Sequence, residues 1–164
     1  KLASEKNSNL QNIFLGKKIL IYGLGKSGIS TFKFLKNKAN IHLFDDNLKK
    51  NQKFISLNKI PKQNFDVWHD RAVFHFLTEQ NQIKKYVDLV SRNISNNGYL
   101  IIGTFSEQGP LKCSGLEVSR YSESLIKTTF IESFTLLNSF KIDHSTPFNT
   151  TQNFLFSVLK KINV

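Results

Sequence analysis

Short apolar runs alternate with segments of helical spacing in this chain, and this alternation limits its fold more than any other feature. Four apolar runs of strand length lie at 17–24, 40–46, 65–70 and 99–105. Apolar side chains recur at helical spacing in 27–37 and 79–95, and two β-rich segments, 134–146 and 150–162, end the chain. Strands that alternate with helices are typical of a mostly parallel sheet. We therefore expect an α/β, Rossmann-like sheet with helices on both faces and a C-terminal antiparallel β-hairpin.

Length and composition fit one domain over 1–164. The chain has 164 residues, of which 40% are hydrophobic and 15 are Phe, enough to bury a substantial core. No apolar run approaches the roughly 18 residues of a membrane span, and residues 1–10 lack the apolar stretch of a secretory signal. The single cysteine, Cys113, cannot form an internal disulfide, which fits a reducing compartment. We expect a cytoplasmic protein without a membrane partner.

The net charge of +11 raises the question of a nucleic-acid partner. Most of the excess lies in residues 1–65, which contain 13 lysines and three acidic residues but no arginine. Surfaces that read bases usually combine arginine with aromatic side chains, and these lysines are instead scattered among Asn and Ile. We therefore interpret the charge as a solvated face and expect no specific nucleic-acid partner.

The stretch GLGKSG follows a buried apolar run and precedes a helical segment, which is the context of a nucleotide-binding glycine loop. Gly23 would allow the tight turn, Gly25 the close approach of a ligand, and Gly28 the packing of the helix on the strand. The helix N-terminus would offer N–H groups to an anion. Asp45, at the end of the next apolar run, would accept hydrogen bonds from two ribose hydroxyls. These residues predict a nucleotide-type ligand; the alternative is a glycine turn kept for packing.

A second polar cluster, WHDRAVFHFLT, follows the third apolar run. His69, Asp70, Arg71 and His75 lie within seven residues of one another. Because imidazole titrates near neutrality, His69 or His75 is a candidate general base. Asp70 and Arg71 would shape a substrate or cofactor site, or would pair with each other in a structural role. No metal site is expected, because the cluster lacks a recognisable ligand spacing.

From about residue 64 to the end, the chain resembles the C-terminal half of class I S-adenosylmethionine-dependent methyltransferases. The matching pieces, in the order of that family, are FDVWHDRAVFHFLT, YVDLVSRNI, NNGYLIIGTFSEQGPLKCSGL, VSRY and DHSTPFNTTQNFLF. The resemblance implies S-adenosylmethionine as cofactor, a small-molecule methyl acceptor, and a loop at His69–Phe76 that faces both. The residues expected at the cofactor are Gly23, Gly25, Gly28, Asp45, Asp70 and Arg71, and the catalytic candidates are His69 and His75.

Residues 2–59 resemble a different family, the N-terminal nucleotide-binding domain of UDP-N-acetylmuramoyl-alanine D-glutamate ligase. The resemblance lies in KKILIYGLGKSGISTFKFLKNKANIHLFDDN. In that family the glycine loop and the acid after the second strand hold a uridine nucleotide. The ATP loop and the catalytic central domain of the ligase have no counterpart in this sequence, so ligase activity is not expected. The two resemblances together predict a chimera, with a ligase-like half at 1–63 and a methyltransferase-like half at 64–164.

Two departures from the methyltransferase pattern concern the first half. The glycine loop of that family follows an acidic residue, whereas Ile21 and Tyr22 stand here. Only residues 47–64 separate the second apolar run from the third, so the third strand of a full methyltransferase fold is expected to be lost. The sequence predicts an S-adenosylmethionine-dependent methyltransferase of a small molecule, and leaves open whether its activity is impaired. The alternatives are a non-catalytic UDP-sugar-binding module and a dinucleotide-binding Rossmann module of the oxidoreductase type.

Overall fold

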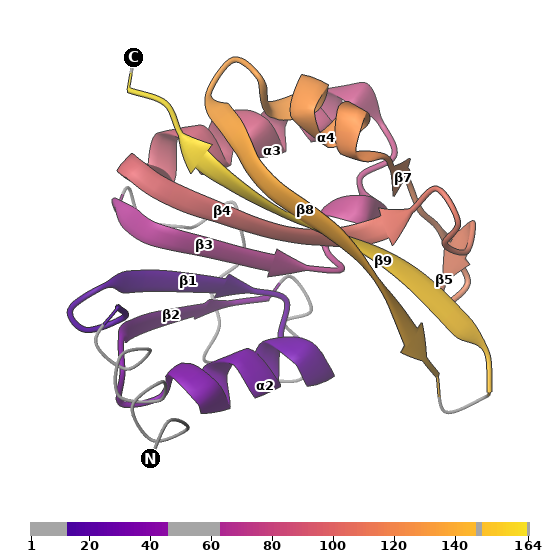
Figure 1. Ribbon diagram of the computed structural model, residues 1–164, viewed down its shortest axis with the longest axis horizontal. Helices are drawn as coiled ribbons and strands as arrows, with labels where there is room; N and C mark the ends of the chain where they lie inside the picture. Colours follow the sequence, from indigo (N-terminus) through magenta and orange to yellow (C-terminus); the bar gives the residue numbers. More distant parts are fainter. Residues whose placement is uncertain (1–12, 46–62, 147–148, 164) are drawn as a thin grey trace.

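The computed structural model describes residues 13–45, 63–146 and 149–163, and these residues form one mixed sheet with helices on both faces (Figure 1). The sheet has seven strands in the order β2-β1-β3-β4-β9-β8, with β7 beside β4. The strands are β1 Lys18–Tyr22, β2 Asn40–Phe44, β3 Phe65–Arg71, β4 Ile94–Ser106, β7 Arg120–Tyr121, β8 Phe134–Ser145 and β9 Thr151–Lys161. A separate two-stranded sheet joins β5 Lys112–Cys113 and β6 Leu116–Glu117. The helices are α2 Lys26–Leu35, α3 Gln80–Asn93 and α4 Glu123–Phe130, with a short 3₁₀ helix, η2, at Phe74–Phe76.

Strand direction confirms the expected fold class. Strand β1 runs parallel to β2 and β3, and β3 runs parallel to β4. Strand β9 is antiparallel to both β4 and β8, so β8 and β9 form the predicted C-terminal hairpin. The hairpin is long and twists across the end of the sheet in Figure 1, as antiparallel ribbons do.

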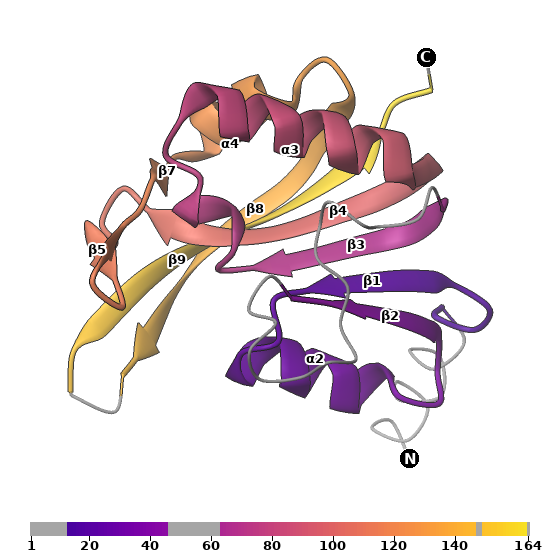
Figure 2. The ribbon, with the colours of Figure 1, turned by 180° about the vertical axis from the view of Figure 1, so that it is seen from behind.

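The two faces of the sheet bury different helices, because successive residues of a strand point to opposite sides. On one face Ile19 and Ile21 pack with Leu35 of α2. On the other face Leu20 belongs to a larger core that includes Trp68 and residues of α3 and α4. Figure 2, from behind, shows α3 and α4 together on one side of the sheet and α2 on the other. Strand β1 is thus buried on both faces, which explains its unbroken hydrophobicity.

Strand β4 begins earlier than the sequence predicts. The stretch NNG at 96–98 suggests a helix stop, with a strand only from residue 99. In the structure α3 already ends at Asn93, and β4 takes over at Ile94. The ladder between β3 and β4 shifts register between Phe65 and Val67, and Asn97 has a φ of +62°. A bulge therefore absorbs the turn-forming residues inside the strand.

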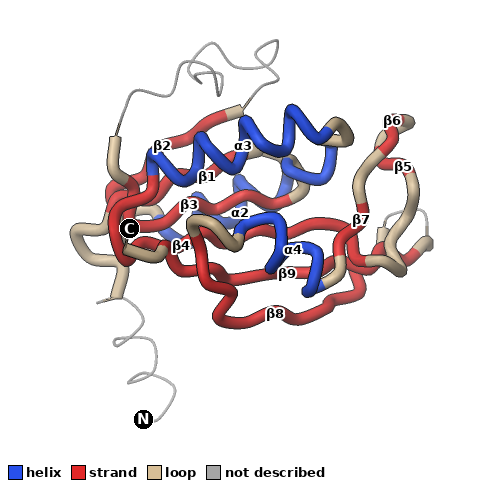
Figure 3. The backbone as a smooth tube through the Cα atoms, turned by 90° about the horizontal axis from the view of Figure 1, so that it is seen from above, coloured by secondary structure: helices blue, strands red, loops and turns tan. Residues whose placement is uncertain are grey.

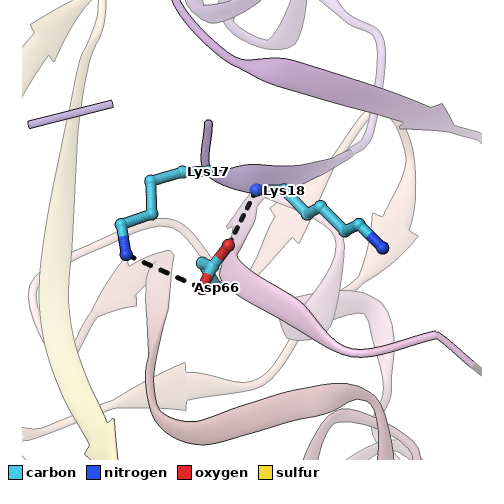
Figure 4. Close-up of polar contacts among 3 residues, drawn as sticks. All are labelled: Lys17, Lys18 and Asp66. Carbon is cyan, nitrogen blue, oxygen red and sulfur yellow. Dashed lines mark hydrogen bonds and ion pairs between the residues drawn. The ribbon is translucent and has the colours of Figure 1, made fainter. Parts of the chain in front are cut away.

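Asp66 ties β1 to β3 at the amino ends of the strands (Figure 4). Its Oδ2 accepts a hydrogen bond of 2.8 Å from the backbone N–H of Lys18. Its Oδ1 lies 3.8 Å from the Nζ of Lys17. This contact helps to set the parallel register in which Ile19 faces Val67. The candidate site lies at the other ends of these strands, the carboxyl ends of β1, β2 and β3.

Some predictions fall on residues outside the described ranges. The short helix expected at 48–58, the carboxylate of Asp46 and most of the segment 47–64 that was expected to lack a third strand lie there. Within the described residues, β2 is the terminal strand on its side of the sheet.

Candidate functional site

A cavity of about 670 Å³ lies at the carboxyl ends of β1, β2 and β3. Ligands of open parallel sheets bind at this edge, and ligand pockets commonly measure about 300–1,000 Å³. The lining residues come from the glycine loop, the end of β2, the end of β3 and the β5–β6 hairpin. They are Tyr22, Gly23, Leu24, Gly25, Lys26, Ser27, Gly28, Asp45, Arg71, Ala72, Val73, Phe76 and Leu116.

Each glycine of the loop meets a different physical demand. Gly23 has a φ of +86°, and a Cβ there would lie 2.5 Å from Cγ2 of Val73. A Cβ on Gly28 would lie 1.9 Å from the carbonyl oxygen of Gly23, so only glycine lets α2 pack this close to the loop. Gly25 differs from both, because nothing lies within 4 Å of its Cβ position. Gly25 therefore borders open space at the cavity rather than packed protein.

Asp45 follows β2 and lines the cavity beside the loop. Its Oδ2 accepts a hydrogen bond of 2.8 Å from the backbone N–H of Leu24. The N–H of Gly23 donates to the carbonyl of Phe44 at 2.9 Å, so the end of β2 fixes the loop at two successive residues. The carboxylate thus orders the loop and also brings a negative charge to the cavity wall.

Arg71, the last residue of β3, brings a positive charge to the same cavity. Its guanidinium donates a hydrogen bond to the hydroxyl of Ser27 in the glycine loop. The guanidinium carbon also lies 5.2 Å from the ring centroid of Phe154 and 5.5 Å from that of Phe156, both on β9. Partial burial lowers the pKa of Arg71, yet a guanidinium remains protonated at neutral pH. Two segments far apart in sequence, the glycine loop and β9, therefore hold this cation in place.

Asp70 points to the other face of the sheet, away from Arg71. Its Oδ2 accepts a hydrogen bond of 2.6 Å from the phenol of Tyr86 on α3. Its Oδ1 accepts the backbone N–H of Val73 at 3.1 Å and that of Phe74 at 3.4 Å. The fully buried carboxylate thus holds the turn into η2, and Asp70 is not among the described residues that line the cavity. Asp70 thus makes a structural contact with Tyr86, and its role at a cofactor stays a prediction.

The two candidate bases, His69 and His75, are not among the described residues that line the cavity. His75 is fully buried in η2, where its ring stacks on Phe105 with centroids 4.6 Å apart. Neither ring nitrogen of His75 has a hydrogen-bond partner among the described residues, and the same holds for Nδ1 of His69. Burial lowers the pKa of each to about 4, with the charge of Arg71 as a second cause for His69. Both imidazoles are therefore neutral at pH 7.

Two apolar side chains also contribute to the cavity. Phe76, at the end of the loop His69–Phe76, lies in the lining, and so does Leu116 on the β5–β6 hairpin, which sequence reasoning missed. Leu116 remains largely exposed, so the hairpin holds an apolar side chain at the cavity mouth. No sequence pattern marks Leu116, because the hairpin is short and its position depends on chain folding after β4.

The described residues contain no group of three or more His, Cys, Asp or Glu side chains arranged to hold a metal ion. Among them, too, no helix combines the length and the hydrophobicity needed to cross a membrane.

Comparisons with known proteins identify solved structures with a similar fold. No family model matches the sequence, and no curated protein matches it significantly. Among solved structures, the N-methyltransferase NodS from Bradyrhizobium japonicum WM9 aligns with a TM-score of 0.67 and 12% identity, over 98% of this chain and 97% of that one. A S-adenosylmethionine-dependent methyltransferase from Methanosarcina mazei gives 0.69 and 10% identity, over 96% and 98%. The 1,6-didemethyltoxoflavin-N1-methyltransferase of Burkholderia thailandensis, solved with bound 1,6-didemethyltoxoflavin and S-adenosylhomocysteine, gives a TM-score of 0.69 and 14% identity, over 98% of this chain and 76% of that one.

These alignments bear on the predicted chimera. Each covers nearly the whole chain, so one methyltransferase-type fold accounts for both 1–63 and 64–164. The comparisons give no support to a separate, ligase-like origin of the first half. At identities of 10–14% the likeness concerns three-dimensional structure alone. The chain therefore has the mixed α/β, Rossmann-like fold of these class I methyltransferases.

Proposed function

We propose that this protein is an S-adenosylmethionine-dependent methyltransferase that acts on a small molecule. The observation that carries the proposal is the cavity at the carboxyl ends of the parallel strands, where the glycine loop, Asp45 and Arg71 meet. The methyltransferase-type fold supports it, and two structures with similar folds were solved with S-adenosylhomocysteine.

The residues present fit the chemistry of this cofactor. S-adenosylmethionine carries a ribose, an α-amino-carboxylate and a methyl group on a sulfonium, and when bound it supplies that methyl group. Asp45 at the end of β2 would accept hydrogen bonds from ribose hydroxyls. Arg71 and the N-terminus of α2 would attract the carboxylate. The open Cβ position of Gly25 lets the ligand approach the backbone.

The part of the cavity that would hold the methyl acceptor is better suited to orienting it than to acid–base catalysis. Holding an acceptor beside the cofactor converts a bimolecular step into an effectively unimolecular one. Phe76 and Leu116 present apolar surface that would hold the acceptor and exclude water. His75, neutral at pH 7 and without a partner for its ring nitrogens, is the candidate to take a proton from an acceptor that must lose one. Because its ring is fully buried, that role requires local movement of η2.

The runner-up is a non-catalytic module that binds a UDP-sugar or a dinucleotide. The same residues favour it, since a glycine loop and an acid after the second strand also suit those ligands. Asp45 cannot separate the two functions, because all of these ligands carry a ribose. The identity of the bound ligand can separate them.

Thermal unfolding in the presence of candidate ligands tests the proposal. We expect S-adenosylhomocysteine to raise the melting temperature, and UDP-N-acetylmuramoyl-alanine and NAD to leave it unchanged. Saturation at 100 times the Kd adds about 2.7 kcal/mol to the free energy of unfolding, which a melt resolves. A shift with only the UDP compound or only NAD would transfer the function to the runner-up. No shift with any ligand would contradict both.

Two matched variants connect the shift to the cavity. Gly25→Ala places a methyl group in the open space of the loop and should abolish the shift without lowering the intrinsic melting temperature. Ser30→Ala, on the exposed part of α2, should keep the shift. With binding established, transfer of labelled methyl groups to a panel of thiol, amine and hydroxyl acceptors would identify the substrate class.

A further inference from the structure

We infer that the outer edge of β8 is a self-association surface, on which β8 of a second copy of this chain pairs antiparallel about a twofold axis at Ile142. Strand β8 is the last of the sheet order, beyond β9. Figure 3 shows it at the margin of the molecule, with no described strand or helix beyond it. This inference does not depend on the proposed function.

The backbone of β8 shows which residues can pair outward. Near the hairpin turn, the N–H of Thr146 donates to the carbonyl of Thr150 at 2.8 Å, so this pair is a hydrogen-bonded one. In antiparallel ladders such pairs alternate with non-hydrogen-bonded ones. Ile142, paired with Phe154 and four residues before Thr146, therefore directs its N–H and C=O toward β9. The odd-numbered residues from 139 to 145 direct theirs outward, where a further strand would find them.

The side chains of the same stretch divide into an apolar and a charged face. Phe140 and Ile142 lie on one face and are 45% and 48% exposed. Phe140 also stacks on Phe156 of β9, with ring centroids 5.7 Å apart. Lys141 and Asp143 are exposed on the other face, where Asp143 accepts a hydrogen bond of 2.6 Å from the side chain of Asn153. This stretch of β8 thus exposes two large apolar side chains on one face. On the other face it exposes one positive and one negative side chain, two residues apart.

The charges select one register for a symmetric pair. With the axis at Ile142, Lys141 of each copy lies directly opposite Asp143 of the other, and the two isoleucines face each other. The backbone N–H and C=O groups of Lys141 and Asp143 point outward. Each Lys141–Asp143 pair is therefore a hydrogen-bonded pair of the new ladder. An axis at Lys141 or at Asp143 would place two like charges face to face, which destabilises a pair of strands. An axis at Phe140 would place Lys141 opposite Ser139 and form no ion pair.

Exposed edge strands also carry charges for the opposite purpose, namely to prevent association. The two readings differ in what charge reversal does. If Lys141 and Asp143 only protect the edge, their signs do not matter, and the wild-type protein is monomeric. If they pair across a twofold axis, each single reversal disrupts the pair, and combining the reversals restores it.

The experiment measures molar mass by light scattering and sedimentation over a range of micromolar concentrations. We expect the wild-type chain to form a dimer. Lys141→Glu places Glu opposite Asp143, and Asp143→Lys places Lys opposite Lys141, so each variant should dimerise about tenfold or more weakly. The double variant Lys141→Glu/Asp143→Lys should dimerise as the wild type does. A mixture of the two single variants should form a heterodimer, because the opposed charges then attract at both positions.

Circular dichroism and thermal melts of each variant show that the fold is retained. Rescue in the mixture controls for local effects, because each partner still carries its own substitution. A wild-type chain that stays monomeric would overturn the inference and assign the charges to edge protection. Single variants that still dimerise, or a mixture and a double variant that stay monomeric, would overturn the register.

Discussion

The phenol of Tyr86 donates a hydrogen bond of 2.6 Å to the buried carboxylate of Asp70. Together with the backbone N–H groups of Val73 and Phe74, this bond satisfies a charge that has no access to solvent. Burial, reinforced by the neighbouring carboxylate, raises the pKa of Tyr86 well above its usual value, so the phenol remains a donor at all ordinary pH values. The contact joins α3 to the turn that leads from β3 into η2.

Removal of this donor should destabilise the protein. Tyr86→Phe leaves the Asp70 carboxylate with one partner fewer in a buried place, which costs about 1–3 kcal/mol of unfolding free energy. Urea denaturation measures this change. Tyr99→Phe, at a position 37% exposed, is the matched control and should change stability little. Equal stabilities of the two variants would show that the Asp70 contact contributes nothing.

Two glycines of the loop should respond oppositely to alanine. In Gly28→Ala the new methyl group meets the carbonyl of Gly23, which requires α2 to move and costs about 3 kcal/mol or more. Gly25 has a φ of −62°, which alanine adopts without strain, so Gly25→Ala should be neutral or stabilising by up to about 1 kcal/mol. Chemical denaturation of both variants gives the comparison. A well-folded Gly28→Ala protein would contradict the packing described here.

Arg71 should contribute to binding of S-adenosylhomocysteine if the proposed function holds. Arg71→Ala removes the cation that lines the cavity, and a lost charge-assisted hydrogen bond weakens binding roughly tenfold or more. Arg71→Lys keeps a positive charge but not the planar group that bonds Ser27 and lies over the rings of β9, so its affinity should be intermediate. Titration calorimetry gives the Kd values, with Lys33→Ala on the exposed part of α2 as the control. An unchanged Kd in Arg71→Ala would place the ligand elsewhere.

His75 should make the protein sensitive to mild acid. Its folded-state pKa is about 4, whereas an unfolded chain binds this proton near pH 6.5. The neutral ring therefore contributes stability that is fully present above pH 6.5 and is lost as the pH falls toward 4. His75→Phe keeps a stacking ring but cannot titrate. Between pH 6.5 and 5 the wild type should lose about 1.6 kcal/mol more than this variant.

Denaturation curves at several pH values measure the effect. His144→Gln, at an exposed position of β8, shows whether any histidine substitution alters the slope. Parallel pH profiles for the wild type and His75→Phe would mean that His75 has access to solvent protons in the folded state.

The sequence by itself determined the local elements and the class of the fold. Apolar runs that are buried on both faces must become central strands, and Gly23 and Gly28 mark a loop where a side chain has no room. For that reason the glycine loop, the acid after β2 and the C-terminal hairpin were predictable. The early start of β4 was not, because a bulge opposite Phe65 and Val67 overrode the turn signal of its Asn and Gly residues.

Only the tertiary structure decided which side chains meet. Asp70 and Arg71 are neighbours in sequence, yet the strand sends them to opposite faces, one into the core and one to the cavity. The partners of Arg71 come from α2 and β9, and Leu116 reaches the cavity from a separate hairpin. No periodicity encodes such contacts, because they depend on how distant segments pack. The same packing leaves β8 at the edge of the described sheet. We infer that Lys141 and Asp143 pair there with the same residues of a second copy.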